Sequence, residues 1–158
     1  MSDAPTTAAL VFRVRDRLCT LPLEHVVETM RPQPVKAVAG APPYVAGIAL
    51  IRGSALPVVD VARLLDVSAA PTSTSDDAAR FVTVRAAHRT VALAVDAVVG
   101  VRGLTPGAFR DLPPLLRDAA PGGVTTIASL DAELLVVLDA ARIAPAASLA
   151  ERLDGTAR

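Results

Sequence analysis

The side chains most often used in catalysis and metal binding are few in this sequence and lie far apart. There are two histidines, His25 and His88, separated by 63 residues, and one cysteine, Cys19. A zinc site takes about four ligands, most of them Cys or His. The phosphate-binding patterns G-x-x-x-x-G-K-[ST] and G-x-G-x-x-G and the nucleophile pattern G-x-S-x-G do not occur. We therefore expect no enzymatic activity, no metal and no cofactor, and we interpret Cys19 as a small buried side chain.

Two aspartates occupy equivalent places in the sequence. Asp60 and Asp139 each end an apolar run and begin the pattern Asp-x-x-Arg followed by an apolar residue. An aspartate at the point where a strand turns into a helix accepts hydrogen bonds from the first free backbone N–H groups. We interpret both residues as helix caps rather than as general acids or bases.

Arg52 is the charged residue whose surroundings are most unusual. The segment Gly47–Asp60 reads G-I-A-L-I-R-G-S-A-L-P-V-V-D, so that two apolar runs meet at Arg52-Gly53. Apolar runs separated by two residues that include glycine predict a β-hairpin. A positive charge at the tip of such a hairpin is available for recognition of a partner.

Composition limits the classes of function that need to be considered. The chain has 158 residues, of which 16 are basic and 16 acidic, so its net charge is zero. Balanced charge provides no general attraction to nucleic acid or to an anionic membrane surface. The N-terminus lacks the basic start and apolar stretch of a signal peptide, and no window reaches the roughly 18 apolar residues of a membrane span. We expect a cytoplasmic protein that neither binds nucleic acid nor inserts into a membrane.

The apolar residues predict a mainly β protein. Hydrophobic residues make up 52% of the chain and aromatic residues only 3%, and β-branched runs favour strands. Helical stretches of ten or more residues are missing between the short apolar runs, which favours small barrels over alternating strand–helix units. The predicted strands are Leu10–Arg15, Leu18–Leu23, Val26–Met30, Val45–Ile51, Ser54–Val59, Arg80–Arg85, Thr90–Val95, Val98–Arg102, Val124–Leu130 and Glu133–Leu138.

The two halves of the sequence repeat each other. L-P-L-E-H-V-V at 21–27 aligns with L-A-V-D-A-V-V at 93–99, and residues 48–64 align with 127–143. Such self-similarity predicts two related β subdomains. The second copy has Asp131 where the first has Arg52, so the hairpin does not require the arginine and its charge is free for recognition.

The expected organisation has three parts. Residues 1–8 form a flexible N-terminus, and residues 9–145 form one domain whose halves divide near 71–79 and can exchange strands. Residues 146–158 form a C-terminal helix or tail, because Ser148 and Glu151 have the spacing of a capping box.

Three segments carry a resemblance to a known family. They are A-P-P-Y-V-A-G-I-A-L-I-R-G-S-A-L-P-V-V-D-V-A-R-L-L at 41–65, R-T-V-A-L-A-V-D-A-V-V-G-V at 89–101 and L-L-V-V-L-D-A-A-R-I at 134–143. In this order they resemble the CheW family of chemotaxis coupling proteins, over roughly residues 8–145. The resemblance implies a mainly β fold of two SH3-like, five-stranded β-barrel subdomains with a few short helices. It also implies a non-catalytic adaptor that joins the cytoplasmic tips of methyl-accepting chemoreceptors to the regulatory domain of a CheA-type histidine kinase, in membrane-associated arrays.

The resemblance also implies which residues contact the partners. Arg52 matches the arginine of the family's Asn-Leu-Arg-Gly turn, and Glu28 matches an acidic residue associated with receptor binding. The residues expected at the receptor are Val26, Glu28, Gly47 and Arg52, and those expected at the kinase are Val95, Val98, Val99 and Val101.

One departure from the family pattern opens an alternative. Leu50 stands where the family turn has asparagine, two residues before Arg52. A CheW-like decoy that binds the kinase but not receptors is therefore a second hypothesis. A small β-barrel ligand-binding protein is a third, although the sequence suggests no pocket with convergent polar groups.

Overall fold

The computed structural model describes residues 6–66, 76–86, 88–111, 114 and 124–143, and these residues are mostly strands. The strands form two sheets, with the order β8-β1-β2-β11-β10-β9 in sheet A and β3-β6-β7-β5-β4 in sheet B. Their bounds are β1 Thr7–Val14, β2 Arg17–Pro22, β3 Val26–Met30, β4 Val45–Ile51, β5 Ser54–Asp60, β6 Arg80–Ala86, β7 Arg89–Val95, β8 Ala97–Leu104, β9 Phe109–Asp111, β10 Val124–Leu130 and β11 Glu133–Leu138.

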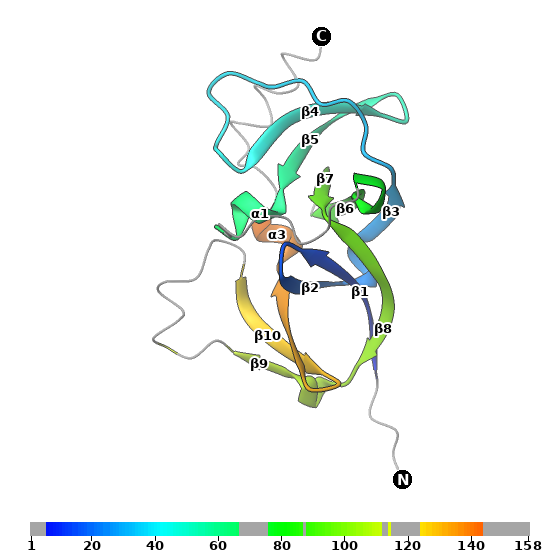
Figure 1. Ribbon diagram of the computed structural model, residues 1–158, viewed down its shortest axis with the longest axis vertical. Helices are drawn as coiled ribbons and strands as arrows, with labels where there is room; N and C mark the ends of the chain where they lie inside the picture. The colour runs from blue at the N-terminus through cyan, green and yellow to red at the C-terminus, as the bar shows by residue number, and fades with distance from the viewer. Residues whose placement is uncertain (1–5, 67–75, 87, 112–113, 115–123, 144–158) are drawn as a thin grey trace.

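Short helices connect some of these strands. They are the 3₁₀ helices η1 Leu23–His25, η2 Asp76–Ala78 and η3 Pro106–Ala108, and the α-helices α1 Val61–Leu64 and α3 Ala140–Ile143. Figure 1 shows the two sheets one above the other, with α1 and α3 lying where they meet. The prediction of a mainly β fold with a few short helices is confirmed, and the strands lie in two sheets.

The ten predicted strands all occur, with ends that differ by at most a few residues. Sheet A differs from the predicted five strands because β9 adds a sixth at its edge, paired with β10. Three residues inside a Pro/Gly-rich connection carry too little alternation to predict a strand. β1 begins at Thr7, inside the part expected to be a flexible N-terminus, while the predicted C-terminal helix lies outside the described residues.

The sheets do not follow the two halves of the sequence. Sheet A contains β1 and β2 together with β8 to β11, whereas β3 to β7 form sheet B. The chain crosses from one sheet to the other between β2 and β3, and crosses back between β7 and β8. These crossings lie in the aligned segments 21–27 and 93–99. The sequence repeat therefore corresponds to a structural repeat in which each half gives its first two strands to the sheet that the other half completes. The first half gives β1 and β2 to sheet A, and the second half gives β6 and β7 to sheet B.

One ion pair holds the second of these crossings. Asp96 is the single residue between β7 and β8, and its carboxylate accepts from Arg15, which lies in the turn between β1 and β2. The Arg15 Nη1 to Asp96 Oδ1 distance is 3.0 Å, and the Arg15 backbone N–H donates to the same carboxylate. The Asp96 backbone N–H in turn donates to the Arg13 carbonyl. This contact fixes the chain at the point where it changes sheets.

A shared apolar core joins the two sheets. The largest cluster of buried residues takes Phe12 and Leu21 from sheet A, Val82 and Leu93 from sheet B, and Ile143 from α3. Burial of apolar surface is the main favourable term in folding, so the sheets stabilise each other through this cluster. A smaller cluster around Val11, Leu104 and Leu135 fills the inside of sheet A.

The tips of the β4–β5 and β10–β11 hairpins are two-residue turns with unusual backbone angles. Arg52 and Gly53 have φ values of 50° and 80°, and Asp131 and Ala132 have 49° and 65°. Positive φ at both positions gives the type I′ turn that suits the twist of β-hairpins. Alanine is unfavourable at positive φ because its Cβ crowds the backbone.

Replacing Ala132 with glycine should therefore stabilise the protein. We expect Ala132→Gly to raise the free energy of unfolding by about 1 kcal/mol, as part of the relieved strain is offset by the greater freedom of glycine in the unfolded chain. Urea denaturation measures this as a higher midpoint at an unchanged slope. The matched control is Gly53→Ala, which should lower the midpoint. An added Cβ there meets no atom within 4 Å, so the loss would come from the backbone φ of +80°, which is unfavourable for alanine. A lower midpoint for Ala132→Gly would contradict this account of the turn.

The thiol of Cys19 should be unreactive in the folded protein. Cys19 is fully buried in the shared core, and this burial raises the pKa of the thiol to about 12. Only the thiolate is nucleophilic, so at about pH 8.5 a thiol reagent such as DTNB should label the protein only after denaturant is added. Rapid labelling under native conditions would show that this part of the core opens readily.

Candidate functional site

The structure brings Glu28 and Arg52 together although they are 24 residues apart. Arg52 Nε donates to both carboxylate oxygens of Glu28, each at 2.9 Å. The Arg52 side chain is 78% exposed, whereas that of Glu28 is 27% exposed. The carboxylate is thus largely enclosed by the protein, while most of the guanidinium is open to solvent.

The charge of Arg52 is secure at this position. The hydrogen bond to Glu28, and then the negative charge of that carboxylate, raise the pKa of Arg52 above its already high ordinary value. The guanidinium is therefore always protonated and available as a donor. Because the pair is exposed on the arginine side, it is expected to contribute little to stability.

The curvature of sheet B explains how these residues meet. Glu28 lies on β3 and Arg52 follows β4, and these strands are the two edges of the sheet. The sheet curls so that the tip of the β4–β5 hairpin reaches the opposite edge, which is the arrangement of an incompletely closed barrel. Within the described residues the Arg52–Glu28 contact is made by side chains, since β3 and β4 are not neighbours in the hydrogen-bonded order.

A shallow hollow of about 340 Å³ lies beside the ion pair. Its lining residues are Glu28, Met30, Gln33, Leu50, Ile51 and Arg52. Leu50 is 70% exposed, which is unusual for so large an apolar side chain. The site therefore combines an exposed cation with an exposed leucine.

Two other residues expected at the receptor are not part of this site. Val26 is half-buried and packs against the shared core, and its neighbour Val27 is the exposed residue. Gly47 is buried, with a φ of +148°, and a Cβ at this position would lie 2.0 Å from the Lys36 carbonyl oxygen. Gly47 is thus required by the approach of the backbone at Lys36, which pairs with Ile48. Met30 and Gln33 are site residues that the sequence reasoning missed.

The residues expected at the kinase divide into two groups. Val99 and Val101 are 45% and 50% exposed on β8, an edge strand of sheet A. Val95 belongs to the buried shared core and Val98 packs against it from β8. The Val95 side chain is buried in the core, so it supports β8 from within, and its predicted contact with a partner stays a prediction. Alternation along β8 explains the exposure of Val99 and Val101.

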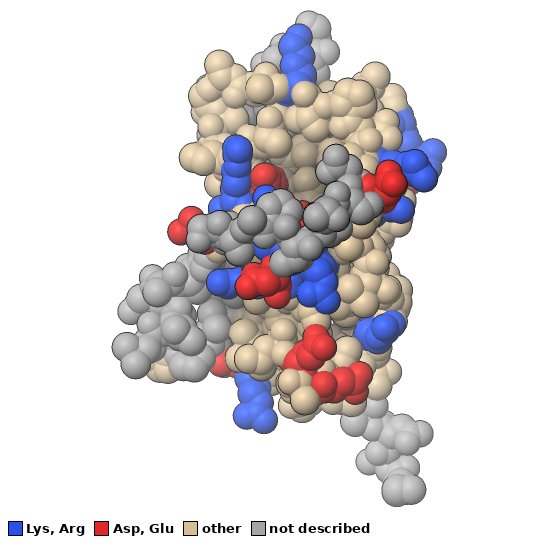
Figure 2. Space-filling view, in the orientation of Figure 1, with Lys and Arg blue, Asp and Glu red and all other residues tan. Residues whose placement is uncertain are grey.

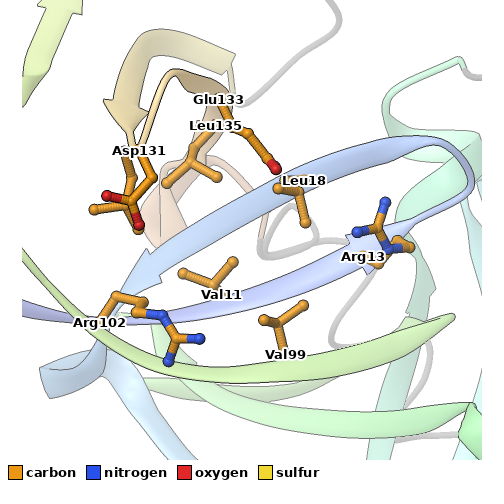
Figure 3. Close-up of a pocket in the computed structure, with 9 residues that line it drawn as sticks. Val11, Arg13, Leu18, Val99, Arg102, Asp131, Glu133 and Leu135 are labelled. Carbon is orange, nitrogen blue, oxygen red and sulfur yellow. The ribbon is translucent and has the colours of Figure 1, made fainter.

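Val99 also borders a second hollow, of about 190 Å³, shown in Figure 3. Apolar side chains from β1, β2, β8 and β11 form its floor, and Arg13, Arg102, Asp131 and Glu133 lie around its rim (Figure 3). The Arg102 guanidinium lies close to the chain, since its Nη1 donates to the Val101 carbonyl at 3.1 Å. This hollow is the open end of the smaller core of sheet A.

Asp60 caps α1. Its Oδ1 accepts from the backbone N–H groups of Ala62 at 3.1 Å and Arg63 at 3.4 Å, and its own backbone is extended. For Asp139, which directly precedes α3, the backbone carbonyl accepts from the N–H of Ile143, the last residue of that helix. The capping role of the Asp139 carboxylate stays a prediction.

The histidines and carboxylates form no chemical cluster in the part of the chain that the structure describes. His88 is exposed in the turn between β6 and β7, and His25 lies 3.6 Å from Glu24 at the surface. Among the described residues no group of three or more His, Cys, Asp or Glu side chains could hold a metal ion. No helix among the described residues is long and apolar enough to span a membrane. Figure 2 shows basic and acidic residues interspersed over one face rather than gathered into a patch of one sign.

Comparison with known proteins shows the family and the fold. A model of the CheW-like domain matches residues 8–148. The chain belongs to the CheW-like domain family. A probable chemotaxis protein CheW from Rhizobium etli is 26% identical over 132 residues, which are 82% of each protein. The crystal structure of the scaffolding protein TtCheW from Thermoanaerobacter tengcongensis matches with a TM-score of 0.73 at 21% identity, covering 85% of this chain and 89% of that one. Family membership supports a role as a chemotaxis adaptor.

Gly47 and Arg52 should respond differently to substitution. Gly47→Ala should lower the free energy of unfolding by about 2 kcal/mol or more, because the new Cβ overlaps a backbone carbonyl and the φ is strained. Arg52→Ala should leave the urea midpoint almost unchanged, since an exposed side chain is removed. Parallel urea titrations measure both. A large loss of stability in Arg52→Ala would show that the ion pair is a structural element.

Proposed function

We propose that this protein is a non-catalytic adaptor that couples the cytoplasmic tip of a chemoreceptor to a CheA-type histidine kinase. The observation that carries the proposal is the Arg52–Glu28 pair, which holds an exposed guanidinium beside an exposed leucine at the rim of sheet B. Ion pairs with so exposed a partner typically contribute little to stability, so a role in recognition accounts for the pair better than a role in folding.

The receptor would bind at this rim. Only Nε of Arg52 is bonded to Glu28, so both terminal nitrogens keep their hydrogens for a carboxylate of the partner. Leu50 and Met30 offer apolar surface next to that charge. An amphipathic helix that presents apolar residues and a carboxylate on one face fits this combination, and helices commonly dock in this way.

The kinase would bind at the edge of sheet A. Val99 and Val101 project from β8, which within the described residues has a hydrogen-bonded neighbour, β1, on one side only. An edge strand with exposed valines is a surface that readily pairs with another protein. The two proposed surfaces lie on different sheets, so both partners can bind at once. We place the protein in the cytoplasm, where receptor tips and kinase meet.

Leu50 supports a second candidate, a decoy that binds the kinase without binding receptors. Leu50 occupies the surface beside Arg52 and is one of the most exposed apolar side chains of the described residues. A receptor helix that presents a polar group at this point would find a hydrogen-bond partner in the family's asparagine but none in the leucine side chain.

Binding of the purified protein to a receptor-tip fragment and to the regulatory domain of the kinase tests these proposals. We expect Arg52→Ala to weaken receptor binding about tenfold or more while kinase binding stays unchanged. We expect Val101→Asp to weaken kinase binding while receptor binding stays unchanged. Isothermal titration calorimetry or a pull-down measures both arms. The matched control is Arg63→Ala, which removes another exposed arginine in an ion pair, with Asp60 at 3.6 Å.

Each outcome separates the candidates. Binding of the unmodified protein to the kinase alone would favour the decoy, and binding to neither partner would overturn both proposals. Equal effects of Arg52→Ala and Arg63→Ala on receptor binding would show that the receptor site lies elsewhere.

A further inference from the structure

Strand β3 contains a bulge directly before Glu28. Val26 pairs with Val84 and Glu28 pairs with Thr83, so Val27 is an extra residue that has no paired residue on β6. Val27 is 55% exposed, in agreement with its displacement from the ladder. Bulges bend a strand and change the direction in which the following side chain points. The direction of Glu28 therefore depends on how this bulge is held.

The hydroxyl of Thr83 is hydrogen-bonded to both the N–H and the carbonyl of Glu28. Thr83 Oγ1 accepts from the Glu28 N–H at 3.2 Å and donates to the Glu28 carbonyl at 3.2 Å. The residue is 2% exposed, so water does not replace these bonds. A buried hydroxyl that uses both its donor and an acceptor fixes the position of the residue it contacts.

We propose that Thr83 is a positioning residue for the Arg52 site. It holds Glu28 at the bulge so that the carboxylate faces the tip of the β4–β5 hairpin and receives Arg52 Nε. The chain of contacts runs from the Thr83 hydroxyl through the Glu28 backbone and carboxylate to the Arg52 guanidinium. Thr83 itself lies beneath the surface, where a bound partner would not touch it.

A second buried threonine distinguishes this role from ordinary packing. Thr20 on β2 is 1% exposed, and its hydroxyl donates to the Leu10 carbonyl at 2.9 Å within sheet A. It has the same chemistry and burial as Thr83 but no connection to Glu28 or Arg52. Thr20→Val therefore reproduces the loss of a buried hydroxyl without the proposed effect on the site.

The test is the NMR signal of the Arg52 Nε–Hε group, identified by its loss in Arg52→Lys. In Thr83→Val we expect this signal to move toward its position in Glu28→Gln, because the carboxylate is no longer held against Nε. Thr83→Ser keeps the hydroxyl and should restore the original position, and Thr20→Val should leave the signal in place. Thr83→Ala removes the hydroxyl without adding a methyl group where oxygen was, and serves if Thr83→Val does not fold.

An unchanged signal in Thr83→Val or Thr83→Ala overturns the inference. So does an equal displacement in Thr83→Ser, since packing rather than the hydroxyl would then be responsible.

Receptor binding is a separate arm, and it rests on the function proposed above. There Thr83→Val should weaken binding of the receptor tip roughly threefold to tenfold, the size expected for one or two lost hydrogen bonds, with Thr83→Ser close to the unmodified protein. If the Arg52 signal moves while neither Thr83→Val nor Arg52→Ala affects receptor binding, the proposed receptor function fails and the positioning role of Thr83 stands.

Discussion

The fold depends on one apolar core to which both sheets contribute side chains. Its members come from β1 and β2 of sheet A, from β5, β6 and β7 of sheet B, and from α1, β11 and α3. Because the first two strands of each sequence repeat belong to the opposite sheet, removing either half of the chain would leave both sheets incomplete. With few aromatic residues, this close packing of Val, Leu, Ile and Ala supplies most of the stability. Stability is thus concentrated in the middle of the molecule, and the outer rims are free to vary.

The proposed binding surfaces lie on those rims. Arg52 and Glu28 join the two edges of sheet B, and Val99 and Val101 lie on an edge of sheet A. The backbone on each side of the ion pair has a defined geometry, which is the type I′ turn at Arg52-Gly53 and the bulge at Val27. A charge that is already held in position by an ion pair loses less freedom when it binds, which favours recognition. A solvent-exposed arginine can in this way be precise in position without stabilising the fold.

The sequence predicted most of the strands because the apolar runs are short, β-branched and bounded by turn residues. It predicted the Arg52 hairpin for the same reason, and the repeat identified Arg52 as a residue that the frame does not need. It did not predict that Glu28 pairs with Arg52, because this contact comes from the curvature of a whole sheet. The bulge at Val27 was also invisible, since V-V-E-T-M continues an ordinary strand pattern.

Two of the predicted site residues have structural roles that the sequence did not reveal. Gly47 and Val95 were assigned to partners by resemblance, and in the structure Gly47 lies at a close backbone approach and Val95 lies in the core. Position in a motif does not distinguish a residue that supports a surface from one that forms it. That distinction needs the side-chain direction, which a bulge such as the one on β3, or the irregular pairing between β1 and β8, shifts by one residue.

The exchange of strands also sets an order of events during synthesis on the ribosome. All five strands of sheet B lie between residues 26 and 95, so its pairing can be complete before sheet A has its later members. The β1–β2 hairpin is made first, but its neighbours β8 and β11 are made much later, and β11 ends at Leu138. Until then both edges of that hairpin are open, and unpaired edges are the places where chains associate wrongly. The oldest part of the nascent chain is consequently the last to be protected.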